Sequence, residues 1–202
     1  MTAPHRGERT LSPTRELPPV IIQSVPPSRW WRITALMLLA LAVVAAGMTY
    51  RLFVRPELPP LPDRVDVIFV LSGYGDRDHI AEQLVREGRA SVVVRSTTAE
   101  RAAAGRCLTG LTDITVICIH PEPYTTRGEA RAITALAAEH GWRSMILVTS
   151  RDQAWRAGVR VGRCFDGQIY HAIAELPDNM WPRQLVYQWG ATVKAYTTER
   201  SC

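Results

Sequence analysis

Small, hydroxyl and charged residues gather in four short segments, each of which follows an apolar run of the sequence. The first segment, 72–76, reads Ser-Gly-Tyr-Gly-Asp and precedes an expected helix. Two glycines in such a place let backbone N–H groups approach an anion, and the helix dipole adds to the attraction. A plain tight turn explains the same residues equally well. Ser72, Gly73 and Gly75 are therefore candidate ligand-binding residues.

Hydroxyl residues also follow the second and fourth apolar runs. Thr97 stands among three neighbouring hydroxyl residues, one of which is expected to cap a helix, and ligand contact is the alternative. Thr149 and Ser150 end the fourth run, where hydroxyls and helix amides can hold an oxyanion. Arg156 suits two-pronged recognition of phosphate or carboxylate, or else it pairs with a neighbouring acid. Gln153 lies between them and is a further candidate contact.

The third segment, 120–129, is crowded with polar groups that two prolines stiffen. Glu122 is a candidate ligand contact there. Thr126 and Glu129 match the S/T-x-x-E capping box, so helix capping is the default role of both. Thr126 is also a candidate ligand contact, and Glu129 is the only plausible base nearby. Glu129 is therefore the one candidate catalytic residue, although the sequence leaves open whether the protein is an enzyme.

Several common kinds of site are absent from the sequence. The chain contains no G-x-G-x-x-G fingerprint, no Walker loop and no G-x-S-x-G elbow. It has no C-x-x-C pair, so no metal site is predicted, and no cofactor can be named. Residues 63–202 carry 17 basic and 16 acidic side chains, and a nearly neutral domain of this kind attracts nucleic acid only weakly. No nucleic-acid partner is predicted.

The four segments are positioned by an alternation of apolar runs and helical patterns. Buried strands are expected over 65–71, 91–95, 114–119, 144–149 and 167–171, and helices over 77–87, 98–106, 126–140, 152–163 and 182–198. Such alternation predicts an α/β domain with a mostly parallel five-stranded sheet covered on both faces. Ligands of such sheets bind beyond the carboxyl ends of the strands, where the four segments would meet.

An apolar segment near the N-terminus predicts a membrane anchor. Positions 33–50 carry no formal charge and, with 51–54, are long enough to cross a bilayer. The chain then divides into a disordered tail (1–32), the anchor (33–54), a proline-rich spacer (55–62) and the domain (63–202). A cleaved signal peptide is the alternative, but the charged region before the apolar run and the run itself are both long for one.

All four cysteines follow the anchor, which favours disulfides in an oxidising compartment. Three pairings are open, and Cys107–Cys118 with Cys164–Cys202 is favoured because the second bond would tie down the last residues. Four reduced thiols are the alternative. The cysteines and the arginines of the tail together favour a cytoplasmic N-terminus with the domain on the outer side of the cell membrane.

Three short motifs resemble the YdcF-like family, which includes the SanA and ElyC envelope proteins. They lie at 66–75, 125–130 and 147–157, and the resemblance covers about 63–199. It implies a Rossmann-like three-layer domain and a role in the cell envelope or in small-molecule binding. One family member is associated with S-adenosylmethionine, and others with envelope-barrier and peptidoglycan-precursor phenotypes. The resemblance implies no particular reaction.

The chain departs from the family pattern in the first loop, which has fewer glycines, after the second strand, where 96–98 replace a Ser-Gly-Gly turn, and at two glutamines. Gln153 stands where the family usually has His, and Gln188 where it often has Glu; glutamine cannot act as a general acid or base near neutral pH. One hypothesis is an envelope protein that binds an anionic small molecule, phosphorylated or nucleotide-like, or a lipid-linked precursor. The alternative is a non-catalytic binding or scaffold module with a degenerate site. Under both hypotheses, the predicted anchor contacts membrane lipid.

Overall fold

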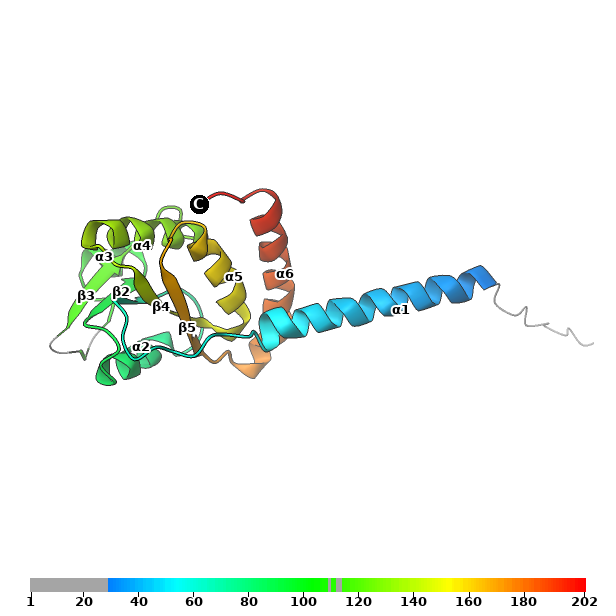
Figure 1. The fold of residues 1–202 in the computed structure, drawn as a ribbon, viewed down its shortest axis with the longest axis horizontal. Helices are drawn as coiled ribbons and strands as arrows, with labels where there is room; N and C mark the ends of the chain where they lie inside the picture. The colour runs from blue at the N-terminus through cyan, green and yellow to red at the C-terminus, as the bar shows by residue number, and fades with distance from the viewer. Residues whose placement is uncertain (1–28, 109, 112–113) are drawn as a thin grey trace, which may run out of the picture. The chain divides into compact units, whose positions relative to one another are not determined.

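The computed structural model describes residues 29–108, 110–111 and 114–202, so the predicted tail lies outside the described residues as far as position 28. Five parallel strands form one sheet in the order β3-β2-β1-β4-β5 (Figure 1). The strands are β1 (Val67–Val70), β2 (Val92–Ser96), β3 (Thr115–Ile119), β4 (Ser144–Ser150) and β5 (Gln168–Ala174). The predicted α/β fold is confirmed, and every pairing in the sheet is parallel.

Helices cover both faces of the sheet. They are α2 (Arg77–Arg86), α3 (Ala99–Ala103), α4 (Thr126–His140), α5 (Arg151–Gly162) and α6 (Trp181–Thr197), with a 3-10 turn η2 (Asp178–Met180) before α6. Alternate residues of β1 face opposite layers, because side chains of a strand alternate in direction. Val67 and Phe69 pack in a core with α4 and α5, whereas Ile68 and Val70 pack in a second core with α2.

Three elements of the α/β domain differ by two or more residues in length from the sequence prediction. Strand β1 spans Val67–Val70 and is shorter than the predicted 65–71. Strand β5 continues to Ala174, because it pairs with β4 along its whole length, from Ser144↔Gln168 to Ser150↔Ala174. Helix α3 is shorter than the predicted 98–106. It ends at Ala103, and Gly105 follows with φ of 60°, a left-handed conformation that no helix can continue through.

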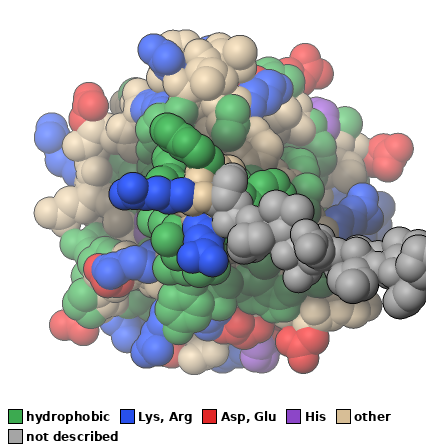
Figure 2. All heavy atoms as spheres, turned by 90° about the vertical axis from the view of Figure 1, so that its right-hand side faces the viewer, with side chains coloured by type: hydrophobic (Ala, Val, Ile, Leu, Met, Phe, Trp, Pro, Cys, Tyr) green, Lys and Arg blue, Asp and Glu red, His purple; other side chains and the backbone are tan. Residues whose placement is uncertain are grey.

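The apolar segment forms a helix, α1 (Arg29–Thr49), that a π-helical turn, η1 (Tyr50–Val54), extends. Among the described residues, this is the one helix that is long and apolar enough to cross a membrane. The apolar side chains of α1 are exposed, as a lipid-facing helix requires. Figure 2 shows hydrophobic side chains gathered in the middle of one face of the molecule, with basic and acidic side chains around them.

The last residues of this apolar helical segment belong to the same compact unit as the domain, which comprises 41–202. Phe53 is fully buried, and its ring meets the Trp189 ring of α6 edge-on at 5.5 Å. The Trp189 indole Nε1 donates a 2.9 Å hydrogen bond to the Thr49 hydroxyl. The end of the apolar helical segment is therefore fixed to α6 by an aromatic contact and a hydrogen bond.

Two disulfides join the four cysteines in the favoured pairing. Cys107 and Cys118 are linked with their Cα atoms 5.7 Å apart, and Cys164 and Cys202 with theirs 4.9 Å apart. No described cysteine is free. The first bond ties the loop after α3 to β3, and the second ties the segment after α6 to the end of α5.

Candidate functional site

A cavity of about 550 Å³ lies at the carboxyl edge of the sheet. The loop after β1, the end of β4, one side of α5, the first turn of α4 and one side of α6 form its walls. This is the place at which parallel α/β sheets bind their ligands. Seven of the eleven candidate residues line it: Ser72, Gly73, Thr126, Glu129, Ser150, Gln153 and Arg156.

The other four candidates do not line the cavity. Gly75 packs against the backbone of Glu175 at the end of β5, and its φ of 94° suits glycine alone. Thr97 is buried and bonds through its backbone N–H to Ile119 O at 2.9 Å. Thr149 is fully buried within β4, and Glu122 is exposed before the cis bond to Pro123.

Glu129 lines the cavity but does not close a capping box. Thr125 is the N-cap of α4, and its hydroxyl accepts a 3.2 Å hydrogen bond from Gly128 N. Thr126 is instead the first helical residue, so the predicted capping pair is wrong by one position. Glu129 Oε1 accepts a 2.7 Å hydrogen bond from Ser72 N, which fastens the glycine loop to α4. The carboxylate is thus held in the cavity wall by a contact remote in sequence.

Arg77, the first residue of α2, is the site residue that the sequence analysis missed. Its guanidinium is 2% exposed and makes five hydrogen bonds, all to neutral acceptors. They go to the carbonyl oxygens of Tyr74, Leu71 and Ser72 and to the side chains of Ser150 and Gln153. A cation at a helix N-terminus opposes the helix dipole, and this unfavourable placement is the sequence signal that points to Arg77.

Arg77 keeps its charge near neutral pH. Burial lowers its pKa to about 10, and the Glu129 carboxylate partly offsets that effect. Among the described residues, no carboxylate lies within ion-pair distance of it. A Cβ at Gly73 would come 2.6 Å from the guanidinium, so the glycine is what allows the loop to close over the charge.

Arg156 of α5 is the second buried cation of the cavity. Its Nε donates a 2.8 Å hydrogen bond to Gln188 Oε1, and its Nη1 donates to the Thr126 hydroxyl at 3.3 Å. Gln188 Nε2 in turn donates to Asp152 Oδ2 at 2.7 Å, so the glutamine separates the cation from the acid. Burial lowers the pKa of Arg156. No described carboxylate pairs with it directly, which decides against the ion-pair alternative.

Three tyrosines stand along the cavity and are about half exposed. They are Tyr74, Tyr124 and Tyr187. The Tyr124 hydroxyl donates a 2.7 Å hydrogen bond to Ser72 Oγ, and the Tyr187 ring lies 5.9 Å from the Arg156 guanidinium carbon. A flat or sugar-like group of a ligand can pack against the faces of these rings.

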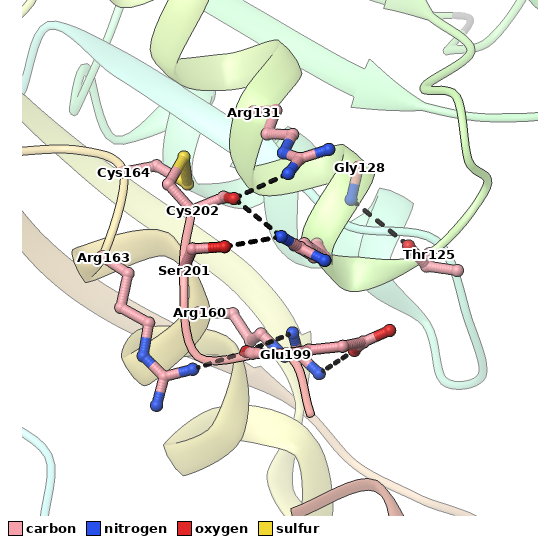
Figure 3. Close-up of a disulfide and its surroundings, with 10 residues drawn as sticks. Thr125, Gly128, Arg131, Arg160, Arg163, Cys164, Glu199, Ser201 and Cys202 are labelled. Atoms are coloured by element: carbon pink, nitrogen blue, oxygen red, sulfur yellow. Dashed lines mark hydrogen bonds and ion pairs between the residues drawn. A yellow bond between two sulfur atoms is a disulfide. The ribbon is translucent and has the colours of Figure 1, made fainter. Parts of the chain in front are cut away.

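The outer wall carries further charges near the Cys164–Cys202 disulfide (Figure 3). Arg160 and Lys194 both form ion pairs with Glu199, and all three side chains line the cavity. In total, six basic and three acidic side chains line the cavity. The basic residues are Arg77, Arg127, Arg156, Arg160, Arg183 and Lys194. This excess of positive charge favours an anionic ligand.

The groups that could act on a ligand are the guanidinium groups and the Glu129 carboxylate, which is the candidate base. Within the described part of the chain, no group of three or more His, Cys, Asp or Glu side chains is placed to hold a metal ion. No model of a known protein family matches the chain, and no curated protein matches it. The likeness of its three motifs to YdcF-like proteins is therefore a prediction from the sequence alone.

Proposed function

We propose that this protein is a membrane-anchored envelope protein whose α/β domain binds an anionic small molecule, or the anionic head of a lipid-linked precursor. One observation carries the proposal: Arg77 and Arg156 are buried in one cavity, and neither pairs with a described carboxylate. The resemblance to YdcF-like proteins, which implies small-molecule binding in the envelope, agrees with this function.

The cost of burying these charges supports a binding role. An unpaired buried charge costs several kcal/mol, and neutral hydrogen-bond partners recover only part of that. A phosphate or carboxylate bound beside Arg156 would recover much of the rest through charge-assisted, two-pronged hydrogen bonds, since Nη2 of Arg156 donates to no described group. Arg77, whose five N–H groups are already bonded, would contribute through its charge alone. Backbone amides of the 72–76 loop and the N-terminus of α5 would add donors to the same anion.

Calorimetric titration of the detergent-solubilised full chain with inorganic phosphate tests the proposal. The variant Arg156→Gln removes one cation and should weaken phosphate binding about 10-fold or more, since a hydrogen bond to a charged group contributes about 1.5–3 kcal/mol. Arg101→Gln makes the same change on the exposed side of α3 and should leave the affinity unchanged. Equal affinity in all three proteins would reject the proposal.

We also propose that the anchor is uncleaved and that the domain lies on the outer side of the membrane. The apolar helix and the two disulfides support this placement, since disulfides persist in oxidising compartments. Alkylation of the protein from intact cells should add mass only after reduction, and the purified chain should retain the anchor. Four alkylated thiols without reduction would place the domain on the inner side.

A non-catalytic binding module is the second candidate, and the two glutamines favour it. Gln153 accepts a 3.2 Å hydrogen bond from Arg77 and donates one of 3.2 Å to the Thr126 hydroxyl. Gln188 links Arg156 to Asp152 in the same way. Both amides thus act as fixed hydrogen-bond bridges, a role that needs no titration. Turnover of a phosphoester or nucleotide that Glu129→Gln abolishes would eliminate this candidate.

A further inference from the structure

We propose that Glu199 determines which anions the cavity accepts, because its carboxylate occupies the outer cationic pair, Arg160 and Lys194. The buried cations left without a described carboxylate partner are then Arg77 and Arg156, and the cavity discriminates against ligands with two adjacent anionic groups. The inference rests on the proposed anion-binding function and adds the ligand class to it: a phosphate monoester or a single carboxylate, rather than a diphosphate.

Glu199 makes closer contacts with the cavity cations than any other acid there. Its Oε2 lies 2.5 Å from Arg160 Nη2, and its Oε1 lies 2.9 Å from Lys194 Nζ. Its backbone oxygen accepts hydrogen bonds from Arg160 at 3.3 Å and from Arg163 at 3.0 Å. Hydrogen bonds from Lys194 and Arg160 lower the pKa of Glu199, so it is a carboxylate at neutral pH. Both cations of the outer pair therefore already have a carboxylate partner, and with Glu199 they keep a single net positive charge.

The segment 199–202 is held in place independently of Glu199. The Arg127 side chain donates to Ser201 Oγ at 2.7 Å and to Cys202 O at 3.1 Å, and Arg131 donates to Cys202 O at 2.7 Å (Figure 3). The Cys164–Cys202 disulfide fastens the same residue to the end of α5. The glutamate is thus a tethered part of the cavity wall.

The positions of Arg156 and Arg160 on α5 determine which side chains a second anionic group of a ligand would contact. Arg156 and Arg160 lie four positions apart, so they stand on one face of the helix with Cβ atoms roughly 6 Å apart. Both line the cavity, and the charge of Arg160 contributes to the lowered pKa of Arg156. A ligand that bridges from Arg156 to Arg160 would place its second anionic group against the Glu199 carboxylate. Like charges at that distance repel, and the repulsion disfavours diphosphates.

The test is the ratio of the pyrophosphate Kd to the phosphate Kd, measured by calorimetry on the full chain. Glu199→Gln should lower this ratio about 10-fold by releasing the outer pair for the second phosphate. Glu139→Gln, an equal change of charge on the exposed side of α4, should leave the ratio unchanged. A ratio that is the same in the wild type and Glu199→Gln overturns the inference while leaving the proposed function intact.

A second variant keeps the test independent of any folding defect in Glu199→Gln. Replacing both Cys164 and Cys202 with Ser removes the covalent tether and leaves only the hydrogen bonds of Arg127 and Arg131, so the ratio should fall in the same direction but by less. The matched control removes Cys107 and Cys118, which do not line the cavity. If Glu199→Gln does not fold, an unchanged ratio in the Cys164/Cys202 variant contradicts the inference. If the wild type binds neither anion, the proposed function fails and the inference fails with it.

Discussion

The backbone N–H of Ser72 donates a 2.7 Å hydrogen bond to Glu129 Oε1, although 57 positions separate the two residues along the chain. The bond joins the glycine loop after β1 to the first turn of α4. Tyr124 strengthens the same junction, since its hydroxyl donates to Ser72 Oγ at 2.7 Å. Glu129 therefore orders the cavity wall in addition to offering a carboxylate.

Substitution of Glu129 separates these two roles. Glu129→Gln keeps an oxygen that can accept from Ser72 N, so the free energy of unfolding should change by less than about 1 kcal/mol. Glu129→Ala leaves that N–H unpaired in a half-buried place and should cost about 1–3 kcal/mol. Urea denaturation of both variants measures the difference. Equal stability of the two variants would show that the hydrogen bond does not hold the loop.

Arg77 should be irreplaceable by lysine. A lysine keeps the charge but has three donors on one atom, whereas the arginine satisfies five acceptors in the loop after β1, at the end of β4 and in α5. Arg77→Lys should therefore destabilise the domain by about 2–4 kcal/mol through unpaired buried carbonyl groups. Chemical denaturation monitored by tryptophan fluorescence provides the measurement. Arg101→Lys, on the exposed side of α3, is the matched control and should change stability by less than about 0.5 kcal/mol.

Gly128 should tolerate no side chain. A Cβ there would overlap with the backbone oxygen of Pro123, which lies in the loop that leads into α4. Gly128→Ala should force the loop to move and cost about 1–3 kcal/mol. Gly190 of α6 provides the contrast, since nothing lies within 4 Å of the position that a Cβ would take there. Gly190→Ala should stabilise the protein by about 0.5–1 kcal/mol. Thermal melting of the two variants should move in opposite directions, and a shift in the same direction would refute this packing.

His171 should make the domain sensitive to acid. Its ring packs against Gly158 of α5, and neither ring nitrogen has a described hydrogen-bond partner. Burial lowers the pKa of His171 from 6.5 to about 4. Between these values the unfolded chain binds more protons than the folded one. The free energy of unfolding should therefore fall as the pH falls from 6.5 to 4, by up to about 3 kcal/mol.

The variant His171→Leu isolates that contribution. Several carboxylates with lowered pKa values, such as Asp66, also reduce stability in acid, so the wild-type curve alone does not identify the histidine. The difference in unfolding free energy between wild type and variant should change over pH 6.5 to 4 and stay constant above about pH 7. A constant difference over the whole range would show that the ring titrates as it does in water.

The elements that position the site were predictable from the sequence because their signals are local. The β-branched run of β1 and the helical spacing of α4, closed by Gly141 with φ of 71°, both require only neighbouring residues. The predicted bounds of α4 agree with the observed ones. The parallel sheet then followed from the alternation of strands and helices.

The site itself was predictable only in part, because it depends on contacts between distant segments. From the sequence alone, Arg77 is only a basic residue at the start of a helix. The contacts that identify it as a site residue are with Ser150 and Gln153, which are distant in the sequence. The capping box failed for the same reason: Glu129 has a partner in another loop that competes with the local one. The α6 wall and Glu199, which follows α6, depend on the placement of that helix over the cavity, and no local pattern encodes this placement.

A crystal structure of the full chain with inorganic phosphate tests the central claim most directly. The account predicts one phosphate in the cavity, with oxygen atoms within hydrogen-bond distance of the Arg156 guanidinium and of the 72–76 loop, and Glu199 still paired with Arg160. An empty cavity at phosphate concentrations that saturate the calorimetric titration would contradict the account. So would a phosphate bound only at a surface outside the cavity.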